Sequence, residues 1–212
     1  MADLESIALS IIGGKRDEVT ADVQQLMDDG VAPERILNEG LISGMSVVGE
    51  RFRRNLIYVP EVLISARALS AGMTLLGPLL AAGGTEPEAK IVLGTVKGDL
   101  HDIGKNLVTM MMQGGGIEVI DLGTDVSAEA FVNAVVSSKA KLIGMSSLLT
   151  TTMPYMSEVI QALKKQGLDD VKVLVGGAPV TQQFADEIGA AGYAADAASA
   201  VEVALRLARQ AA

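Results

Sequence analysis

The sequence predicts a mixed α/β protein, with an N-terminal four-helix bundle followed by a five-stranded parallel sheet of flavodoxin-like (Rossmann-like) order. Residues 4–80 show only the apolar spacing that is typical of helices. Residues 83–88 are rich in turn formers and poor in apolar side chains, which indicates a domain boundary. Beyond them, short apolar runs alternate with helical segments, as in a parallel sheet covered by helices. We therefore expect a helical domain at residues 1–84 and an α/β domain at residues 89–212.

Glycines and prolines divide the helical region. A first helix is expected from Leu4 to the glycines at 13 and 14, and a second from Arg16 to Gly30. A third begins at Pro33, because proline suits the first helical position, and a fourth follows Pro60. The expected apolar face of the third helix comprises Leu37, Leu41, Met45, Val48 and Phe52. That of the fourth comprises Val62, Ala66, Leu69, Met73 and Leu76, a spacing suited to packing against partner helices.

Two glycines, Gly40 and Gly44, fall inside the third helix. Each costs on the order of 1 kcal/mol relative to alanine at such a position. Close approach of a neighbouring helix and a kink would both account for them, and the sequence leaves the two alternatives open.

Strands are expected at residues 90–96, 117–122, 142–146, 172–175 and 193–195, with helices between them. Ser127 and Thr152 are candidate N-caps, and Pro154 marks a helix start. This alternation of strands and helices implies a parallel sheet with right-handed crossovers, and for five strands the flavodoxin-like order 2-1-3-4-5 is the default. The switch point of that order lies between the first and third strands. We therefore expect the loops that follow these two strands to lie side by side at the carboxyl edge of the sheet.

Composition excludes several classes of function. The net charge of −9 and the 3% aromatic content argue against nucleic-acid binding, which needs a basic face or stacking platforms. The absence of cysteine removes disulfides and thiolate metal sites, and it fits a reducing cytoplasm. No secretory signal is evident, and Gly, Pro or charged residues interrupt the apolar runs before they reach the length of a membrane span. We expect a cytoplasmic protein that binds neither nucleic acid nor membrane.

The loop after the first strand, residues 97–106, carries the most informative chemistry. It holds the chain's single histidine, His101, with Asp99 two residues before it and Gly104 three residues after it. A lone histidine is usually structural or simply exposed. Here a carboxylate that fixes one imidazole tautomer would resemble the support that metal-ligating histidines receive. One protein ligand is too few for a zinc site, so if His101 binds a metal, another group must supply the remaining ligands, and a tetrapyrrole-like macrocycle is the obvious candidate.

Four ordered motifs carry a family resemblance that covers essentially the whole chain. Asp99-x-His101-x-x-Gly104 resembles the signature of cobalamin-binding domains that place a histidine on cobalt. Ser-Ser-Leu at residues 146–148 and Val-Gly-Gly-Ala at 175–178 resemble the second and third motifs of these domains. Segments 44–52 and 58–61 resemble the helical cap of methyl-transferring corrinoid proteins. The relatives include the cobalamin-binding region of methionine synthase and the corrinoid proteins of methylamine, methanol and O-demethylase systems.

This resemblance implies a set of cofactor contacts. His101 would be the cobalt ligand, and the loop contacts to the corrinoid would come from Gly98, Asp99, Leu100, His101, Asp102, Ile103 and Gly104. The pocket for the nucleotide tail would use Ser146, Leu148, Thr150, Gly176, Gly177, Asp196 and Ala197. An ordinary turn is the alternative role for Gly176 and Gly177.

The resemblance also assigns a proton relay and a lid. Thr152 stands where methyltransferase relatives carry the serine of a His–Asp–Ser relay, so His101, Asp99 and Thr152 are the candidate catalytic residues. The extra methyl of threonine leaves the relay geometry open, and an N-cap is the alternative role for Thr152. Phe52, Val59 and Val62 match cap residues over the upper corrin face, with a place in the bundle core as the alternative. An apolar lid would shield a reactive metal from water and would have to move to admit a partner.

The resemblance implies a methyl carrier that cycles between cob(I)alamin and methylcob(III)alamin. Its expected partners are a substrate-specific methyltransferase, a second methyltransferase acting on a folate or a thiol, and a reductive activase. No zinc site, nucleophile triad or separate phosphate loop is evident, so the chain is expected to be a corrinoid-carrying subunit and not a complete catalyst. The sequence does not indicate which substrate donates the methyl group.

Two other classes of function remain as alternatives. A cobalamin-sensing regulator would use a similar cap and α/β module, but the acidic charge and the absence of tryptophan weigh against it. The cobalamin-binding half of a radical mutase would resemble residues 89 onward, but such modules normally lack the four-helix cap. A tightly held adenosyl group on the bound cofactor would favour either alternative over the carrier.

Overall fold

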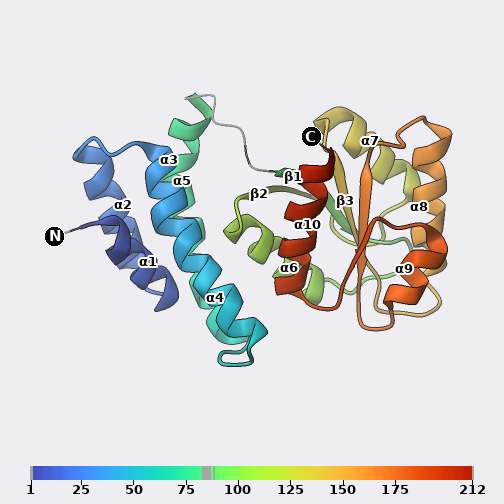
Figure 1. Cartoon of the computed structure of the whole chain (residues 1–212), viewed down its shortest axis with the longest axis horizontal. Coiled ribbons are helices and arrows are strands. Elements are labelled where there is room, and N and C mark those ends of the chain that lie inside the picture. Colours follow the sequence, from blue (N-terminus) through green and yellow to red (C-terminus); the bar gives the residue numbers. More distant parts are fainter. Residues whose placement is uncertain (1, 83–86, 88, 212) are drawn as a thin grey trace. The chain divides into compact units, whose positions relative to one another are not determined.

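The computed structural model describes residues 2–82, 87 and 89–211, and it forms two compact units (Figure 1). One unit comprises Met1–Pro87 with Gly114–Gly116, and the other comprises Glu88–Gln113 with Ile117–Ala212. The boundary expected at residues 83–88 falls, apart from Pro87, outside the described residues. The domain limits 1–84 and 89–212 therefore stay predictions.

The first unit consists of helices, as the sequence predicts. Its elements are α1 (Leu4–Ile12), α2 (Arg16–Asp28), α3 (Pro33–Arg35), the π-helical segment η1 (Ile36–Ile42), α4 (Ser43–Arg53) and α5 (Val59–Ala82). The elements α3, η1 and α4 follow one another without a break and form the predicted third helix, with Pro33 in its first turn. The four predicted helices are confirmed.

The π-helical segment changes which residues the third helix buries. A π turn holds more residues than an α turn, so the 3.6-residue period fails across it. Leu37, which we expected on the apolar face, is only half-buried, and Ile36 is buried in its place. The predicted face is correct at Leu41 near the end of the π segment and at Met45 and Val48 after it, which are all buried.

Gly40 and Gly44 allow α1 to pack closely on the third helix. A Cβ atom at Gly44 would lie 2.7 Å from the carbonyl oxygen of Ala8 and 2.8 Å from the Cβ of Ile11. A Cβ at Gly40 would lie 3.1 Å from a methyl of Ile7. Close helix approach therefore explains both glycines.

The prediction that every apolar run is interrupted before it reaches the length of a membrane span is wrong for α5. Within the described part of the chain, Val59–Leu80 of α5 is long and apolar enough to cross a membrane by length and composition. The same helix supplies the buried residues Val62, Leu69 and Leu76 and packs against α2. A core helix passes the same test of length and composition, although only 39% of this apolar window is buried within the structure.

The second unit is built on the predicted parallel sheet. Its strands are β1 (Ala89–Thr95), β2 (Ile117–Asp121), β3 (Leu142–Ser146), β4 (Lys172–Gly176) and β5 (Gly192–Ala194). They are parallel throughout and pair in the order β2-β1-β3-β4-β5, which confirms the predicted topology. The strand bounds differ from the expected ones by no more than one residue at either end.

Helices cover both faces of this sheet (Figure 1). They are α6 (Ile103–Gly114), α7 (Ala128–Ser138), α8 (Pro154–Lys165), α9 (Gln182–Ile188) and α10 (Ala197–Ala211). On one face, Phe131 of α7 and Met156 of α8 pack with Ile143 of the sheet in one core. On the other face, Met112 of α6 and Leu207 of α10 pack with the opposite side of the sheet. Ser127 caps α7 as predicted, because its side chain accepts a hydrogen bond from the Ala130 N–H at 3.2 Å.

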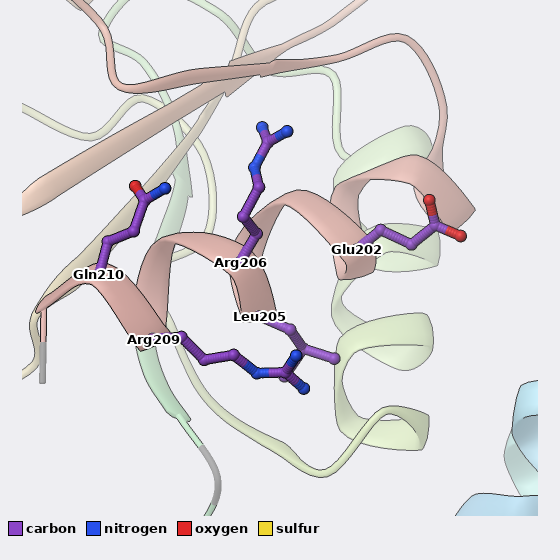
Figure 2. Close-up of a pocket in the computed structure, with 5 residues that line it drawn as sticks. All are labelled: Glu202, Leu205, Arg206, Arg209 and Gln210. Atoms are coloured by element: carbon purple, nitrogen blue, oxygen red, sulfur yellow. The ribbon is translucent and has the colours of Figure 1, made fainter.

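A shallow depression of about 480 Å³ lies on the surface of α10 (Figure 2). It is lined by Glu202, Leu205, Arg206, Arg209 and Gln210, most of them from the second half of that helix. α10 starts directly after β5, near the carboxyl edge of the sheet, so its second half lies toward the opposite edge. The depression includes none of the predicted site residues.

Candidate functional site

The site forms where the loop after β1 meets the loop after β3. These strands are neighbours in the sheet, and β2 flanks β1 on the other side, so this is the topological switch point where parallel sheets bind ligands. Gly98 has φ +79, a left-handed conformation that suits glycine and turns the chain just before Asp99. The predicted neighbourhood of the two loops is confirmed by contacts across about fifty residues of sequence, as in the 2.7 Å hydrogen bond from the Leu148 N–H to Asp99.

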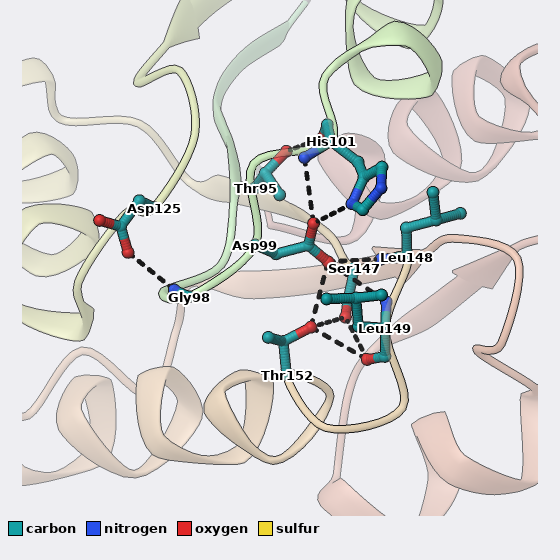
Figure 3. Close-up of polar contacts among 9 residues, drawn as sticks. All are labelled: Thr95, Gly98, Asp99, His101, Asp125, Ser147, Leu148, Leu149 and Thr152. Atoms are coloured by element: carbon teal, nitrogen blue, oxygen red, sulfur yellow. Dashed lines mark hydrogen bonds and ion pairs between the residues drawn. The ribbon is translucent and has the colours of Figure 1, made fainter.

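The carboxylate of Asp99 is the centre of this site (Figure 3). Its side chain is fully buried. One oxygen, Oδ1, accepts hydrogen bonds from the His101 N–H at 3.0 Å and pairs with His101 Nδ1 at 2.7 Å. The other, Oδ2, accepts from the N–H groups of Leu148 at 2.7 Å and Leu149 at 3.3 Å and from the Thr152 hydroxyl at 3.1 Å. The carboxylate thus ties both loops together.

These contacts favour the ionised form of Asp99. Burial by itself would raise the pKa of this carboxyl group. The hydrogen bonds from the backbone of Leu148, from the backbone and ring of His101 and from Thr152 outweigh burial, and they hold the pKa of Asp99 well below its usual range. A charge therefore sits beside the imidazole at neutral pH.

His101 presents one ring nitrogen to solvent. Because an ionised carboxylate only accepts hydrogen bonds, the pairing with Asp99 assigns the proton of the neutral ring to Nδ1. Nε2 then carries a free lone pair, and among the described residues none hydrogen-bonds to it. The side chain is 52% exposed, so this lone pair is accessible. This is the arrangement of a histidine prepared to ligate a metal.

Thr152 extends the pair of His101 and Asp99 into a three-residue network. Its hydroxyl reaches Asp99 Oδ2, and its methyl lies 3.4 Å from the position that a Cβ of Gly98 would occupy. The methyl therefore packs outward against the loop and leaves the hydroxyl directed at the carboxylate. The alternative role as an N-cap is wrong, because the cap position of α8 is Met153 and Thr152 makes no capping contact there. Pro154 opens the helix as predicted.

Ser147 is a further member of this network that the sequence reasoning missed. Its side chain is fully buried, and its hydroxyl lies 2.8 Å from the Thr152 hydroxyl and donates to the Leu149 carbonyl at 3.1 Å. The sequence drew attention to Ser146, but Ser146 is the last residue of β3 and is only half-buried. Two signals pointed to Ser147: it lies within the Ser-Ser-Leu motif at residues 146–148, and side chains alternate along a strand, so Ser146 and Ser147 face opposite sides.

Apolar side chains lie exposed around the histidine. Leu100 and Ile103, on either side of His101 in sequence, are 73% and 83% exposed. Leu148 and Leu149 on the facing loop are also exposed. Ile103 is the first residue of α6, and its side chain faces solvent. Grouped exposed apolar side chains mark a surface that receives a ligand or partner.

The glycines of the motifs differ in what they do for the chain. Gly104 has ordinary helical backbone, and nothing lies within 4 Å of where its Cβ would be. At Gly177, by contrast, a Cβ would fall 1.9 Å from the Ser147 carbonyl oxygen, and φ is +128. A Cβ at Gly176 would lie 3.0 Å from the Ala194 carbonyl oxygen. Close backbone contacts therefore account for glycine at positions 176 and 177, whereas no contact with the described residues accounts for glycine at position 104.

The remaining predicted residues of the α/β unit lie in the loop after β1, in the loop after β3 and at the start of α10. Asp102 is exposed and accepts a hydrogen bond from the Asn106 side chain at 3.0 Å. Thr150 is exposed on the loop after β3. Asp196 begins α10, accepting from the Ser199 N–H at 2.8 Å, and Ala197 is buried behind it. The cap of a helix thus gives Asp196 a structural role of its own.

The predicted lid residues lie in the helical unit. Phe52 is half-buried near the end of α4, and Val59 is 38% exposed at the start of α5. Val62 is fully buried, which fits the alternative of a place in the bundle core.

Among the described residues, no group of three or more His, Asp or Glu side chains is arranged to hold a metal ion. A metal at His101 would therefore need its other ligands from a non-protein group. A planar macrocycle with an open axial position meets that requirement, and it would also cover the apolar side chains around the ring.

Comparisons with known proteins agree with this chemistry. Residues 89–202 match the family description "B12 binding domain", and residues 3–76 match a second B12 binding domain description. A corrinoid protein of Desulfitobacterium hafniense is 43% identical over 211 residues, covering 98% of each chain. Dimethylamine corrinoid protein 1 of Methanosarcina acetivorans is 41% identical over 206 residues, covering 96% of each chain.

Solved structures give the same result. A chain of the methanol:cobalamin methyltransferase complex of Methanosarcina barkeri superposes with a TM-score of 0.87 at 32% identity, covering 97% of this chain and 79% of that one. A cobalamin-binding protein of Desulfitobacterium hafniense gives a TM-score of 0.79 at 33% identity, covering 98% and 99%. With matches over both units and a histidine prepared for metal at the switch point of the sheet, this chain belongs to the corrinoid proteins, and its cofactor is cobalamin.

Proposed function

We propose that this chain is a methyl-carrier corrinoid protein that holds cobalamin with His101 on the lower face of cobalt and works with methyltransferases. The observation that carries the proposal is the pairing of His101 Nδ1 with the buried carboxylate of Asp99, which leaves Nε2 free at the switch point of the sheet. When bound, cobalamin supplies a cobalt centre that accepts a methyl group from one substrate and gives it to another.

The residues around His101 fit such a cofactor. The open space at Gly104 would let a flat ligand approach the backbone closely, and none of the described residues lies within 4 Å of where a Cβ would be. The exposed side chains of Leu100, Ile103 and Leu148 provide apolar area for the ring system. The single imidazole would supply one protein ligand to the metal of such a cofactor.

Asp99 and Thr152 would control the proton on His101. Asp99 accepts the Nδ1–H bond and would keep the proton on Nδ1, in the tautomer that leaves Nε2 available to the metal. The Thr152 hydroxyl, in contact with Asp99 and Ser147, supports the negative charge from the other side.

The tail pocket and the lid complete the proposal. Ser146, Thr150, Gly176 and the start of α10 at Asp196 would surround the nucleotide tail. Phe52, Val59 and Val62 would cover the upper face of the corrin, and for Val62 the support is weakest because its side chain is buried in the helical unit.

The relatives support a methyltransferase partner for this chain, since they include dimethylamine corrinoid proteins and a chain of a methanol methyltransferase complex. A second methyltransferase that acts on a folate or a thiol, a reductive activase and a cytoplasmic location stay predictions. So does the role of a subunit that is not catalytic by itself.

The carrier function is tested with isotopically labelled methyl donors. The chain is loaded with hydroxocobalamin, freed of excess cofactor, reduced, and incubated with labelled dimethylamine or methanol and a methyltransferase of the matching class. We expect label to co-elute with the wild-type chain for one class and not with H101A. Retention of cofactor by the wild type without uptake of label from any class would contradict a carrier and leave a cobalamin-binding protein.

A further inference from the structure

Asp125 is an unusual residue beside the cofactor site. It has φ +55, a left-handed conformation that few residues other than glycine adopt, although aspartate tolerates it better than most. It lies in the loop between β2 and α7, far in sequence from the His101 loop. Backbone strain of this kind persists where surrounding contacts hold it, and it clusters at functional sites.

Asp125 contacts the backbone on both sides of the Asp99 side chain, and Figure 3 shows the contact with Gly98. The Asp125 carboxylate accepts a hydrogen bond from the Gly98 N–H at 2.7 Å. The Asp125 N–H donates to the carbonyl oxygen of Asp99 at 3.0 Å. The left-handed conformation lets one residue make both contacts, and together they fix the backbone on either side of the Asp99 side chain.

Thr95 makes the matching contact at His101. Its hydroxyl donates to the His101 carbonyl oxygen at 2.9 Å, and its side chain is fully buried at the end of β1. The backbone of Thr95 also joins the end of β1 to the loop between β2 and α7. Its N–H donates to the Gly123 carbonyl oxygen at 2.9 Å, and its carbonyl oxygen accepts from the Val126 N–H at 3.0 Å. Neither Thr95 nor Asp125 touches the imidazole or the carboxylate of Asp99 in any of these contacts.

We infer that Thr95 and Asp125 are positioning residues, a backbone clamp that presets the direction in which His101 presents Nε2 to cobalt. This inference rests on the proposed ligation by His101. Because the imidazole is half exposed, packing does not hold it, and its direction depends on Asp99 and on the backbone that carries both residues. A loop released from the clamp would sample other directions, so that less of the bound cofactor would carry the histidine ligand.

The variants D125A and T95V remove the two side-chain contacts, and D125N and T95S are their matched controls. Asparagine tolerates a left-handed backbone and keeps a carbonyl oxygen for the Gly98 N–H. Serine keeps the hydroxyl for the His101 carbonyl, whereas valine has the shape of threonine without a donor. The full chain of each variant is loaded with cob(II)alamin, and the bound cofactor and the fraction with histidine-nitrogen splitting in the EPR spectrum are measured.

Two further measurements separate positioning from a loss of structure. Circular dichroism compares the folded content of the variants. Nitrogen-15 NMR of the apo-protein at neutral pH reports the tautomer of the chain's single histidine, whose signals need no assignment. We expect wild type, D125N and T95S to carry the proton on Nδ1 alone, and D125A and T95V to show both tautomers.

We expect D125A and T95V to weaken histidine ligation on the order of tenfold, as for other residues that orient metal ligands, with D125N and T95S close to wild type. Equal histidine-ligated fractions in wild type, D125A and T95V would overturn the inference and leave the proposed function intact. Should D125A fail to fold, T95V against T95S decides by the same criterion. Absence of histidine splitting in the wild type itself would overturn the proposed ligation and the inference with it.

Discussion

Replacement of Asp99 by asparagine removes acceptor capacity from a buried group that takes hydrogen bonds from five donors. An amide offers one carbonyl oxygen, and its NH₂ only donates. If the NH₂ takes the place of Oδ2, the N–H groups of Leu148 and Leu149 lose their acceptor. If it takes the place of Oδ1, the His101 N–H loses its acceptor, and the ring can pair only by moving its proton to Nε2. Neither orientation of the amide provides acceptors for the hydrogen-bond donors of both loops.

The expected cost follows from the donors left without a partner. A buried donor without an acceptor costs about 1–3 kcal/mol, so D99N should lower the free energy of unfolding of the apo-protein by about 2–4 kcal/mol. D102N is the matched control, because Asp102 is exposed, and it should change that free energy by less than about 0.5 kcal/mol. Urea unfolding at neutral pH, followed by circular dichroism, measures both variants.

Hydrogen exchange adds local resolution to the same test. In D99N the amides of Leu148 and Leu149 should exchange faster than in the wild type, while those of β4 change less. A loss of stability for D99N no larger than that for D102N would refute the reasoning that Asp99 joins the two loops.

Three further predictions concern pH and glycines. The pKa of Asp99 is lower in the folded than in the unfolded chain, so the unfolded chain takes up the proton first as the pH falls. The stability advantage of wild type over D99N should therefore be complete above about pH 4 and shrink below it. An advantage that stays constant down to about pH 2, in urea titrations across that range, would contradict this. G44A should lower the free energy of unfolding by about 1–3 kcal/mol, because the new Cβ would lie 2.7 Å from the backbone oxygen of Ala8. G13A, whose Cβ would meet nothing closer than 3.4 Å, should be neutral within about 0.5 kcal/mol, and equal effects of the two variants in thermal unfolding would argue against close packing of α1. G104A should leave the free energy of unfolding of the apo-protein unchanged, because nothing lies within 4 Å of its Cβ. The same variant should bind cobalamin more weakly in calorimetry. Unchanged affinity would mean that the ligand does not approach this backbone.

The parts of the fold that follow local patterns were predictable from the sequence. Alternating apolar runs and helices give the strand order, and that order brings the loops after β1 and β3 together. The pairing of His101 with Asp99 followed from their spacing within one loop and is confirmed at 2.7 Å. The hydroxyl of Thr152 reaches Asp99 as the relay interpretation requires.

The features that sequence reasoning missed depend on contacts between distant segments. The π-helical segment at Ile36–Ile42 accompanies the close packing of α1 and has no periodic signal of its own. Ser147 joins the network because of the side-chain direction at the end of β3, where the adjacent Ser146 looked equally suitable. The left-handed Asp125 reaches Gly98 across 27 residues of sequence, so no local pattern announces it. Gly177 packs on the Ser147 backbone, a reason for glycine that only three-dimensional structure can supply.

The most direct test of the central claim uses the nuclear spin of nitrogen. The chain is grown with nitrogen-15, loaded with cob(II)alamin of natural isotopic composition, and compared by EPR with an unlabelled sample. If His101 supplies the axial nitrogen, each cobalt line should split into three in the unlabelled sample and into two in the labelled one. A three-line pattern that persists in the labelled protein would show that the axial nitrogen belongs to the cofactor and would contradict histidine ligation.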